Sequence, residues 1–136
     1  MAEHYRVAGD ARPVAPANVR YTRSAVQPSA EIRHLLAASR DPDPEVRRRA
    51  VRELCPCQVK RNDPDVWERV FEMTRDPNVR VRRNALHGMI DGSPAGLAPR
   101  VVAALEAMRD DPEPKLRRNV RRILARYRRT GRINED

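Results

Sequence analysis

Aromatic side chains are scarce in this chain of 136 residues, which has one Trp, one Phe and three Tyr. A core must therefore be built from aliphatic residues and Met, and base stacking of the kind used to bind single strands is not supported. No apolar run approaches the roughly 18–20 residues that cross a bilayer. The first residues also lack the apolar stretch of a secretory signal, so we expect a cytoplasmic protein without membrane association.

Cysteine is almost absent too, because Cys55 and Cys57 are the only two. They are too close together to close a useful disulfide loop, which favours a reducing compartment. Thiolates are good zinc ligands, but a closed site needs four ligands, and His4, His34 and His87 are the only nitrogen donors. The spacing matches no common zinc motif and lacks the two-residue spacer of the usual redox pair. We therefore expect a structural turn with a packed Cys, no metal and no cofactor.

Signals of catalysis are missing as well. The sequence shows no Gly-rich phosphate loop, no carboxylate pair and no metal-ligand cluster. Ser93 lies between Gly92 and Pro94 without a nucleophile-elbow pattern or an evident base, so it predicts a turn. We expect a protein that is not an enzyme, with no catalytic residues and no small-molecule substrate.

Positive charge is abundant and unevenly distributed. The formal net charge is +9, and nine basic residues with no acidic one lie between Lys115 and Arg132. Such a terminal basic block attracts polyanions or acidic protein surfaces. Only two of the basic residues, Lys60 and Lys115, are lysines. The excess of Arg either suits phosphate and carboxylate recognition or records a GC-rich genome.

A short segment recurs at a fixed interval of 35 residues. The stretch 41–48 (DPDPEVRR) returns as 76–83 (DPNVRVRR) and again as 111–118 (DPEPKLRR). An interval of about 20–50 residues is typical of a solenoid, in which each unit buries its apolar face against its neighbours. The interval therefore predicts a stack of repeated units.

Each unit contains two helical patterns. Apolar residues recur at i, i+3 and i+6 in the first helix and at i, i+4 and i+8 in the second, each marking one face of a helix. Pro64 and Pro99 suit the first helical position, and Asp63 is placed to cap the second unit. The first helices are expected at about 30–40, 65–75 and 100–110, and the second helices at about 44–54, 79–90 and 114–129.

These patterns predict an all-α fold, a short right-handed α-solenoid of three helix–turn–helix units at 30–54, 64–90 and 99–129. Residues 1–29 are predicted to form an extended arm rich in Pro, Ala and Arg, and residues 130–136 a C-terminal tail. Position 121 is Arg where the other units have Val51 and Leu86. A charge in an apolar position suits the last unit of a solenoid, which no neighbour covers.

The pattern Asp-Pro-x-x-x-Val-Arg-x-x-Ala-x-x-x-Leu resembles the second-helix consensus of HEAT repeats, particularly the short bacterial kind also found in phycobilisome lyase subunits. Residues 41–54 match every named position, 76–89 have Met89 for Leu, and 111–124 have Leu116 and Val120 substituted. Residues 54–69 are also similar to a small family of uncharacterised bacterial HEAT-repeat proteins. The resemblance covers about 30–129. It implies a fold in which second helices form the concave side that often holds a partner, and it implies no activity.

A helical wheel separates the arginines of the second helices into columns. One column flanks the apolar stripe. The resemblance implies that its arginines pair with the repeat Asp of a neighbouring unit, which is the aspartate that begins each repeated segment. The alternative is that these aspartates act only as turn residues or caps. The predicted structural ladder consists of Asp41, Arg47, Asp76, Arg82, Asp111 and Arg117.

Two further columns lie opposite the apolar stripe and form a grid of basic residues. Rows of arginines suit contacts with successive phosphates, which give affinity without sequence specificity. The simpler interpretation is a solvated face. The predicted binding residues are Arg48, Arg52, Arg83, His87, Arg118 and Arg122, extended on the last helix by Arg126 and Arg129.

Together these features predict a non-enzymatic scaffold that binds an acidic partner, with nucleic-acid backbone (RNA or the ribosome, or DNA) favoured. The alternative is a protein–protein adaptor that binds an acidic protein surface. A HEAT-fold enzyme, such as a bilin lyase subunit or a DNA glycosylase, requires a pocket with acidic and aromatic residues. Asp65 and Trp67 are the only candidates, and the aligned Ile32 and Val102 mark Trp67 as core. The oligomeric state is left open.

Overall fold

The computed structural model describes residues 29–55 and 63–134. Within these ranges the chain forms α-helices and one short 3-10 helix, and no strand. The predicted all-α fold is therefore confirmed, whereas nearly all of the predicted arm, and Cys57, lie outside the described residues. The helices are α2 (Ala30–Ala38), α3 (Pro44–Glu53), α5 (Pro64–Met73), α6 (Val79–Ile90), η1 (Ala95–Leu97), α7 (Ala98–Ala107) and α8 (Pro114–Thr130).

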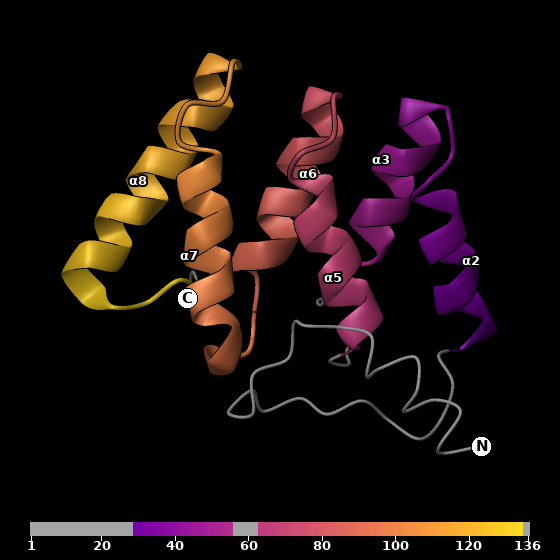
Figure 1. Cartoon of the computed structure of the whole chain (residues 1–136), viewed down its shortest axis with the longest axis horizontal. Helices are drawn as coiled ribbons and strands as arrows, with labels where there is room; N and C mark the ends of the chain where they lie inside the picture. The colour runs from indigo at the N-terminus through magenta and orange to yellow at the C-terminus, as the bar shows by residue number, and fades with distance from the viewer. Residues whose placement is uncertain (1–28, 56–62, 135–136) are drawn as a thin grey trace.

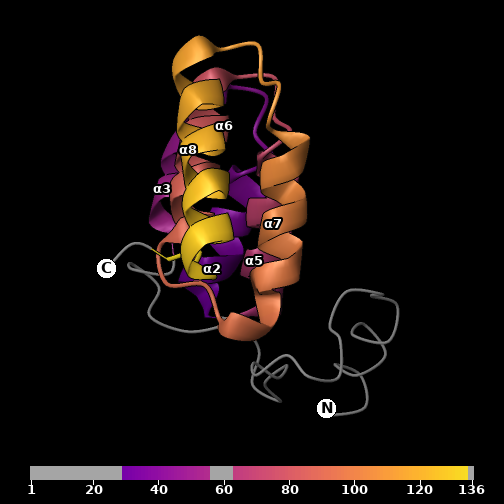
Figure 2. The same ribbon diagram turned by 90° about the vertical axis from the view of Figure 1, so that its left-hand side faces the viewer.

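The helices are arranged in two layers (Figures 1 and 2). The first helices of the units, α2, α5 and α7, lie on one side, and the second helices, α3, α6 and α8, lie on the other. Each first helix packs against the second helix of its own unit, α2 also packs against α5, and α3 against α6. This stacking confirms the predicted helical solenoid. None of the described helices has the length and apolar character needed to cross a membrane.

Polar side chains fix where most helices begin. Asp63 accepts a hydrogen bond from the amide of Asp65 at 2.9 Å, so the predicted cap of α5 is confirmed, and Pro64 is the first helical residue. Asp43, Asn78 and Glu113 cap the three second helices in the same way. The third unit differs, because α7 follows η1 without a side-chain cap and Pro99 is its second residue rather than its first.

One continuous core runs through the stack. Trp67 is 1% exposed and packs against Phe71, with 6.2 Å between the ring centroids. Its burial confirms that Trp67 belongs to the core. Arg100 of α7 covers the Phe71 ring at 4.4 Å and forms an ion pair with Glu68 of α5. A cation over an aromatic face adds to apolar packing where two units meet.

Within the described residues, the first and last units each have a neighbouring unit on one side only. At the first of two aligned positions in the first helices, Glu31 is exposed whereas Val66 and Val101 are buried. At the second, Ile32 and Trp67 are buried whereas Val102 is half-buried. The predicted burial of Val102 is therefore incomplete, because no described helix packs on the far side of α7. In the second helices Val51 and Leu86 are each 1% exposed, whereas Arg121 is exposed. Arg121 bonds the Arg109 carbonyl at 3.0 Å and Asp110 at 2.7 Å, and so covers the end of α7.

The chain turns back after α8. Gly131 has φ +70°, a left-handed conformation that glycine adopts at little cost, and it ends the helix. The side chain of Asn134 then accepts hydrogen bonds from the amide and hydroxyl of Ser93, both at 3.1 Å, and donates to the Ser93 carbonyl at 3.2 Å. Ser93 is thus a turn residue that holds the last described residues against the loop before η1.

Candidate functional site

Paired Arg and Asp side chains join each second helix to the turn of the following unit. Arg47 on α3 donates from Nε to Asp76 Oδ2 at 2.9 Å and from Nη2 to Asp76 Oδ1 at 3.1 Å. One unit later Arg82 on α6 makes the same two contacts with Asp111, at 2.8 and 3.0 Å. Because the geometry is the same at both junctions, these ion pairs are a regular feature of the contact between successive units.

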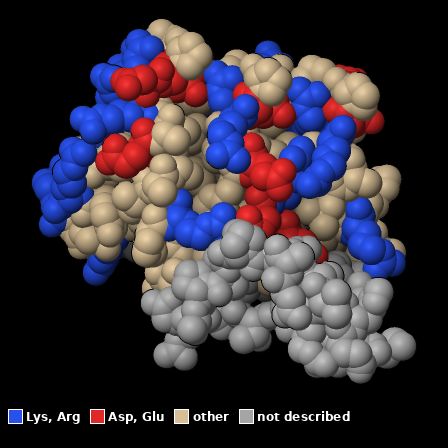
Figure 3. Space-filling model, in the orientation of Figure 1, with Lys and Arg blue, Asp and Glu red and all other residues tan. Residues whose placement is uncertain are grey.

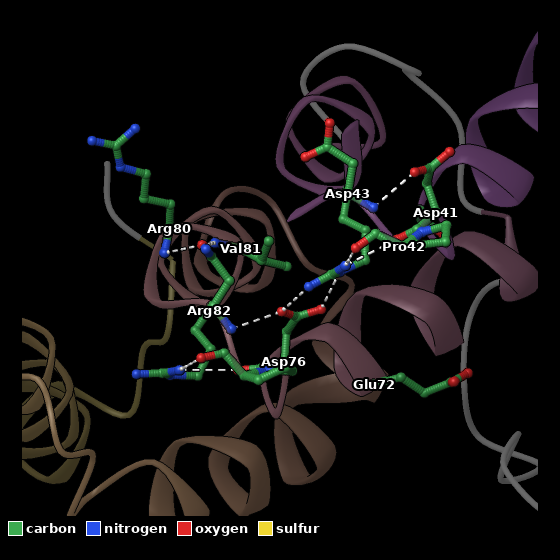
Figure 4. Close-up of polar contacts among 12 residues, drawn as sticks. Asp41, Pro42, Asp43, Glu72, Asp76, Arg80, Val81 and Arg82 are labelled. Atoms are coloured by element: carbon green, nitrogen blue, oxygen red, sulfur yellow. Dashed lines mark hydrogen bonds and ion pairs between the residues drawn. The ribbon is translucent and has the colours of Figure 1, made fainter. Parts of the chain in front are cut away.

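The same arginines also hold the turn of their own unit. Nη1 of Arg47 donates to the carbonyls of Asp41 and Pro42, both at 2.9 Å, and Arg82 bonds the equivalent carbonyls of the next turn. Figure 4 shows Asp76 between the turn at Asp41–Pro42 and Arg82. In all three turns the repeat Asp accepts a hydrogen bond from the amide two residues later. Asp76 is therefore both a turn residue and an ion-pair partner.

The two ends of this series lack a partner in another unit. Asp41 accepts from the amide of Asp43 at 2.8 Å, and Arg117 donates to the carbonyl of Asp111 at 2.8 Å. Neither forms an ion pair within the described residues. We call the two complete pairs, Arg47–Asp76 and Arg82–Asp111, the rungs.

Both rungs are largely buried. The side chains of Arg82 and Asp111 are 12% and 5% exposed. Burial alone raises the pKa of Asp111, but hydrogen bonds from Arg82 and from the amide of Glu113 outweigh it, so that the pKa lies below its ordinary value. The hydrogen bond to Asp76 raises the pKa of Arg47 despite burial. These guanidinium groups are engaged inside the fold, so they are not part of the surface offered to a partner.

On the face of α3 that points away from the core, a carboxylate neutralises part of the positive charge. Arg48 donates to Glu45 Oε2 at 2.8 Å and Oε1 at 2.6 Å, and Arg49 lies 3.4 Å from the same carboxylate. The hydrogen bond from Arg48 lowers the pKa of Glu45 to about 2, so this carboxylate is ionised at neutral pH. The hollow beside these residues is lined by Arg48, Arg49 and the exposed Arg52, and also by one carboxylate, Glu53.

The corresponding face of the second and third units, formed by α6 and α8, is different. A hollow of about 500 Å³ lies where α6 meets α8. No acidic side chain lines it, and no described carboxylate forms an ion pair with any of its four cations. Figure 3 shows Lys and Arg following the edge of the molecule where α8 lies. We call this hollow the basic groove; it is lined by Arg83, Lys115, Leu116, Arg118, Asn119 and Arg122.

The other predicted binding residues have different surroundings. His87 lies beside Asp91, with 3.6 Å between Nε2 and Oδ2, and does not line the basic groove. Arg126 donates to the carbonyl of Ile133 at 3.3 Å. Arg129 is exposed near the end of α8. The structure thus brings together only part of the predicted grid, namely Arg83, Arg118 and Arg122.

The comparisons with known proteins agree with this repeat geometry. A family model for HEAT repeats matches residues 32–125. The chain belongs to the HEAT-repeat family. No curated protein and no solved structure matched the chain. HEAT-repeat proteins are helical scaffolds, typically for binding other proteins, and the family is generally non-catalytic.

Two polar residues of the basic groove in this HEAT-repeat protein are not among the predicted binding residues. Lys115 and Asn119 lie on the same face of α8 as Arg118. The signal for Lys115 was present in the sequence, because the aligned column reads Glu45, Arg80 and Lys115. Each residue of this column lies three positions before Arg48, Arg83 or Arg118, so the two side chains are neighbours on the helix. The column therefore changes from acidic to basic after the first unit, and the face loses the carboxylate that pairs with Arg48.

Proposed function

We propose that this HEAT-repeat protein is a scaffold that binds the phosphate backbone of nucleic acid in the basic groove. The observation that carries the proposal is the convergence of four cations, from two successive units, on a hollow without an acidic side chain. Lys115, Arg118 and Arg122 occupy positions i, i+3 and i+7 of α8 and span about 10 Å along its axis. A row of this kind suits a ligand that carries negative charge at regular intervals.

The chemistry of the lining favours phosphates over an acidic protein surface. Protein interfaces are organised around a core of apolar or aromatic anchors surrounded by a polar rim. Leu116 is the only apolar side chain that lines the basic groove, and it is 2% exposed. Guanidinium groups and an amide, in contrast, are the usual donors to phosphate oxygens. These contacts supply affinity and position without reading a sequence.

The face of α3 has the same repeat positions but is a poor site for a polyanion. Arg48 already shares its charge with Glu45, and Arg52 is adjacent to Glu53. We therefore place the partner over the second and third units. The face of α3 therefore serves as an internal control, because it has equivalent residues that lie beside carboxylates.

The test compares two double variants by fluorescence anisotropy with short labelled duplexes of mixed-sequence RNA and DNA at near-physiological salt. One variant is Arg118→Glu/Arg122→Glu in the basic groove, and the other is Arg48→Glu/Arg52→Glu at the aligned positions of α3. Both change the net charge equally. We expect the first variant to lose at least about tenfold in affinity and the second to lose less than about threefold, since only the first removes phosphate contacts.

Circular dichroism establishes that both variants fold. Equal losses in the two variants would mean that net charge, and not the groove, determines binding, which contradicts the proposal. Poly-L-glutamate serves as the competing probe. If it binds the wild-type chain as tightly as either duplex does, the groove recognises carboxylates, and the protein-adaptor function replaces the nucleic-acid function.

A further inference from the structure

Three side chains with metal-binding atoms converge where the first two second helices end. Cys55 follows Leu54, the C-cap of α3, and Asp91 is the C-cap of α6. His87 lies four residues before Asp91, so the two side chains share one side of the helix. Because α3 and α6 pack against each other, the thiol of the first unit lies beside the imidazole and carboxylate of the second.

The distances suit a single small cation. Asp91 Oδ2 lies 3.6 Å from Cys55 Sγ and 3.6 Å from His87 Nε2, and all three ligand atoms lie within 4.8 Å of one another. Metal–ligand bonds of about 2.0–2.3 Å in a tetrahedral zinc site place neighbouring ligand atoms about 3.3–3.6 Å apart. Two of the three separations are already close to this range. The third closes by rotation of the His87 side chain, which is 64% exposed.

The surroundings also favour a cation. Two helices end at this point, and the carbonyl ends of helices carry partial negative charge. Cys55 is 2% exposed, whereas the Asp91 side chain is 39% exposed. The sulfur ligand therefore lies on the protein side and the nitrogen and oxygen ligands on the solvent side. Water therefore reaches an ion held here from the side of His87 and Asp91.

We propose that Cys55, His87 and Asp91 bind a zinc ion, with the fourth coordination position open to solvent. The mixed sulfur, nitrogen and oxygen ligands select a borderline ion over magnesium or calcium, which bind oxygen. The sequence predicts no metal because a closed site needs four ligands in a known spacing. An open site needs only three protein ligands, and Asp91 supplies the third. The ion joins the first unit to the second, away from the basic groove.

The test is a cobalt titration of the full chain, without an affinity tag and in a Cys57→Ser background, so that any thiolate signal reports Cys55. We expect a thiolate-to-cobalt charge-transfer absorption, its loss on addition of zinc, and a higher melting temperature with zinc. His87→Ala is the decisive variant, because this exposed residue is replaceable without disturbing the core. We expect its zinc affinity to fall at least about 100-fold, more than the about 10–100-fold of outer-shell changes.

His34→Ala, which removes an exposed histidine of α2, is the matched control and should bind zinc like the parent. Cys55→Ser should abolish the charge-transfer band. Absence of the band in the Cys57→Ser background would overturn the proposal, because binding would then need Cys57 or no thiolate at all. Equal zinc affinities of His87→Ala and His34→Ala would also overturn it, and would leave the Cys55–Asp91 contact as a hydrogen bond.

Discussion

Replacement of Arg82 by Gln tests whether the rungs hold the stack together. The variant removes two charge-assisted hydrogen bonds to Asp111 and two to the carbonyls of Asp76 and Pro77, and it leaves the Asp111 carboxylate, which is 5% exposed, without its ion-pair partner. Removing one partner of a buried ion pair costs about 3–5 kcal/mol. Asp111 keeps the hydrogen bond from the amide of Glu113, so we expect the lower end, about 3 kcal/mol. For a domain of this size that loss lowers the melting temperature by roughly 12–24 °C.

Arg117→Gln is the matched control, because Arg117 occupies the same position in the last unit and has no aspartate beyond it. It loses one hydrogen bond to the Asp111 carbonyl, which is worth about 1 kcal/mol. Urea unfolding followed by the fluorescence of Trp67, the only Trp and 1% exposed, measures both losses. Equal costs for the two variants, or a cost below about 0.5 kcal/mol for Arg82→Gln, would refute a structural role for the rungs.

Two further predictions concern pH and the end of the stack. The pKa of Asp111 is lowered in the folded state, so its contribution is present above the unfolded pKa of about 4 and is lost as the pH falls through the folded pKa. Unfolding free energy should therefore fall less between pH 6 and pH 3 in Asp111→Asn than in the exposed control Asp110→Asn, and equal falls would contradict this. Arg121→Leu continues the apolar positions of Val51 and Leu86 onto the uncovered end, so sedimentation should show concentration-dependent association. Arg121→Gln should stay like the wild type, and association of both variants would contradict the capping role.

The 35-residue interval was sufficient to predict the architecture, because helix period and Asp-Pro turns are local signals. It placed α6 at its observed bounds and the other helix ends within a few residues. The offsets are largest around α7, which begins after a 3-10 turn rather than at Pro99. The half-burial of Val102 depends on how the described helices stack, which a single helical wheel does not represent.

The candidate sites were less predictable, because they depend on which side chains neutralise each other. Arg48, Arg83 and Arg118 are equivalent in the repeat but differ in their surroundings, because Glu45 pairs with Arg48 and has basic counterparts in the later units. The cluster of Cys55, His87 and Asp91 depends on which chain positions become neighbours in the fold. With the 35-residue offset, Cys55 aligns with residue 90, adjacent to Asp91. The proximity of Cys55 to Asp91 is therefore visible in the alignment of the units and not in their spacing along the chain.

The salt dependence of duplex DNA binding tests the central claim, that the basic groove holds phosphates, most directly. Four phosphate contacts predict that the logarithm of the affinity falls with the logarithm of the salt concentration with a slope of about −3 to −4. Removing one contact by Arg118→Gln should reduce the magnitude of that slope by about 1, and Arg48→Gln should leave it unchanged. A slope that is the same in Arg118→Gln as in the wild type, or that changes equally in both variants, would contradict the account.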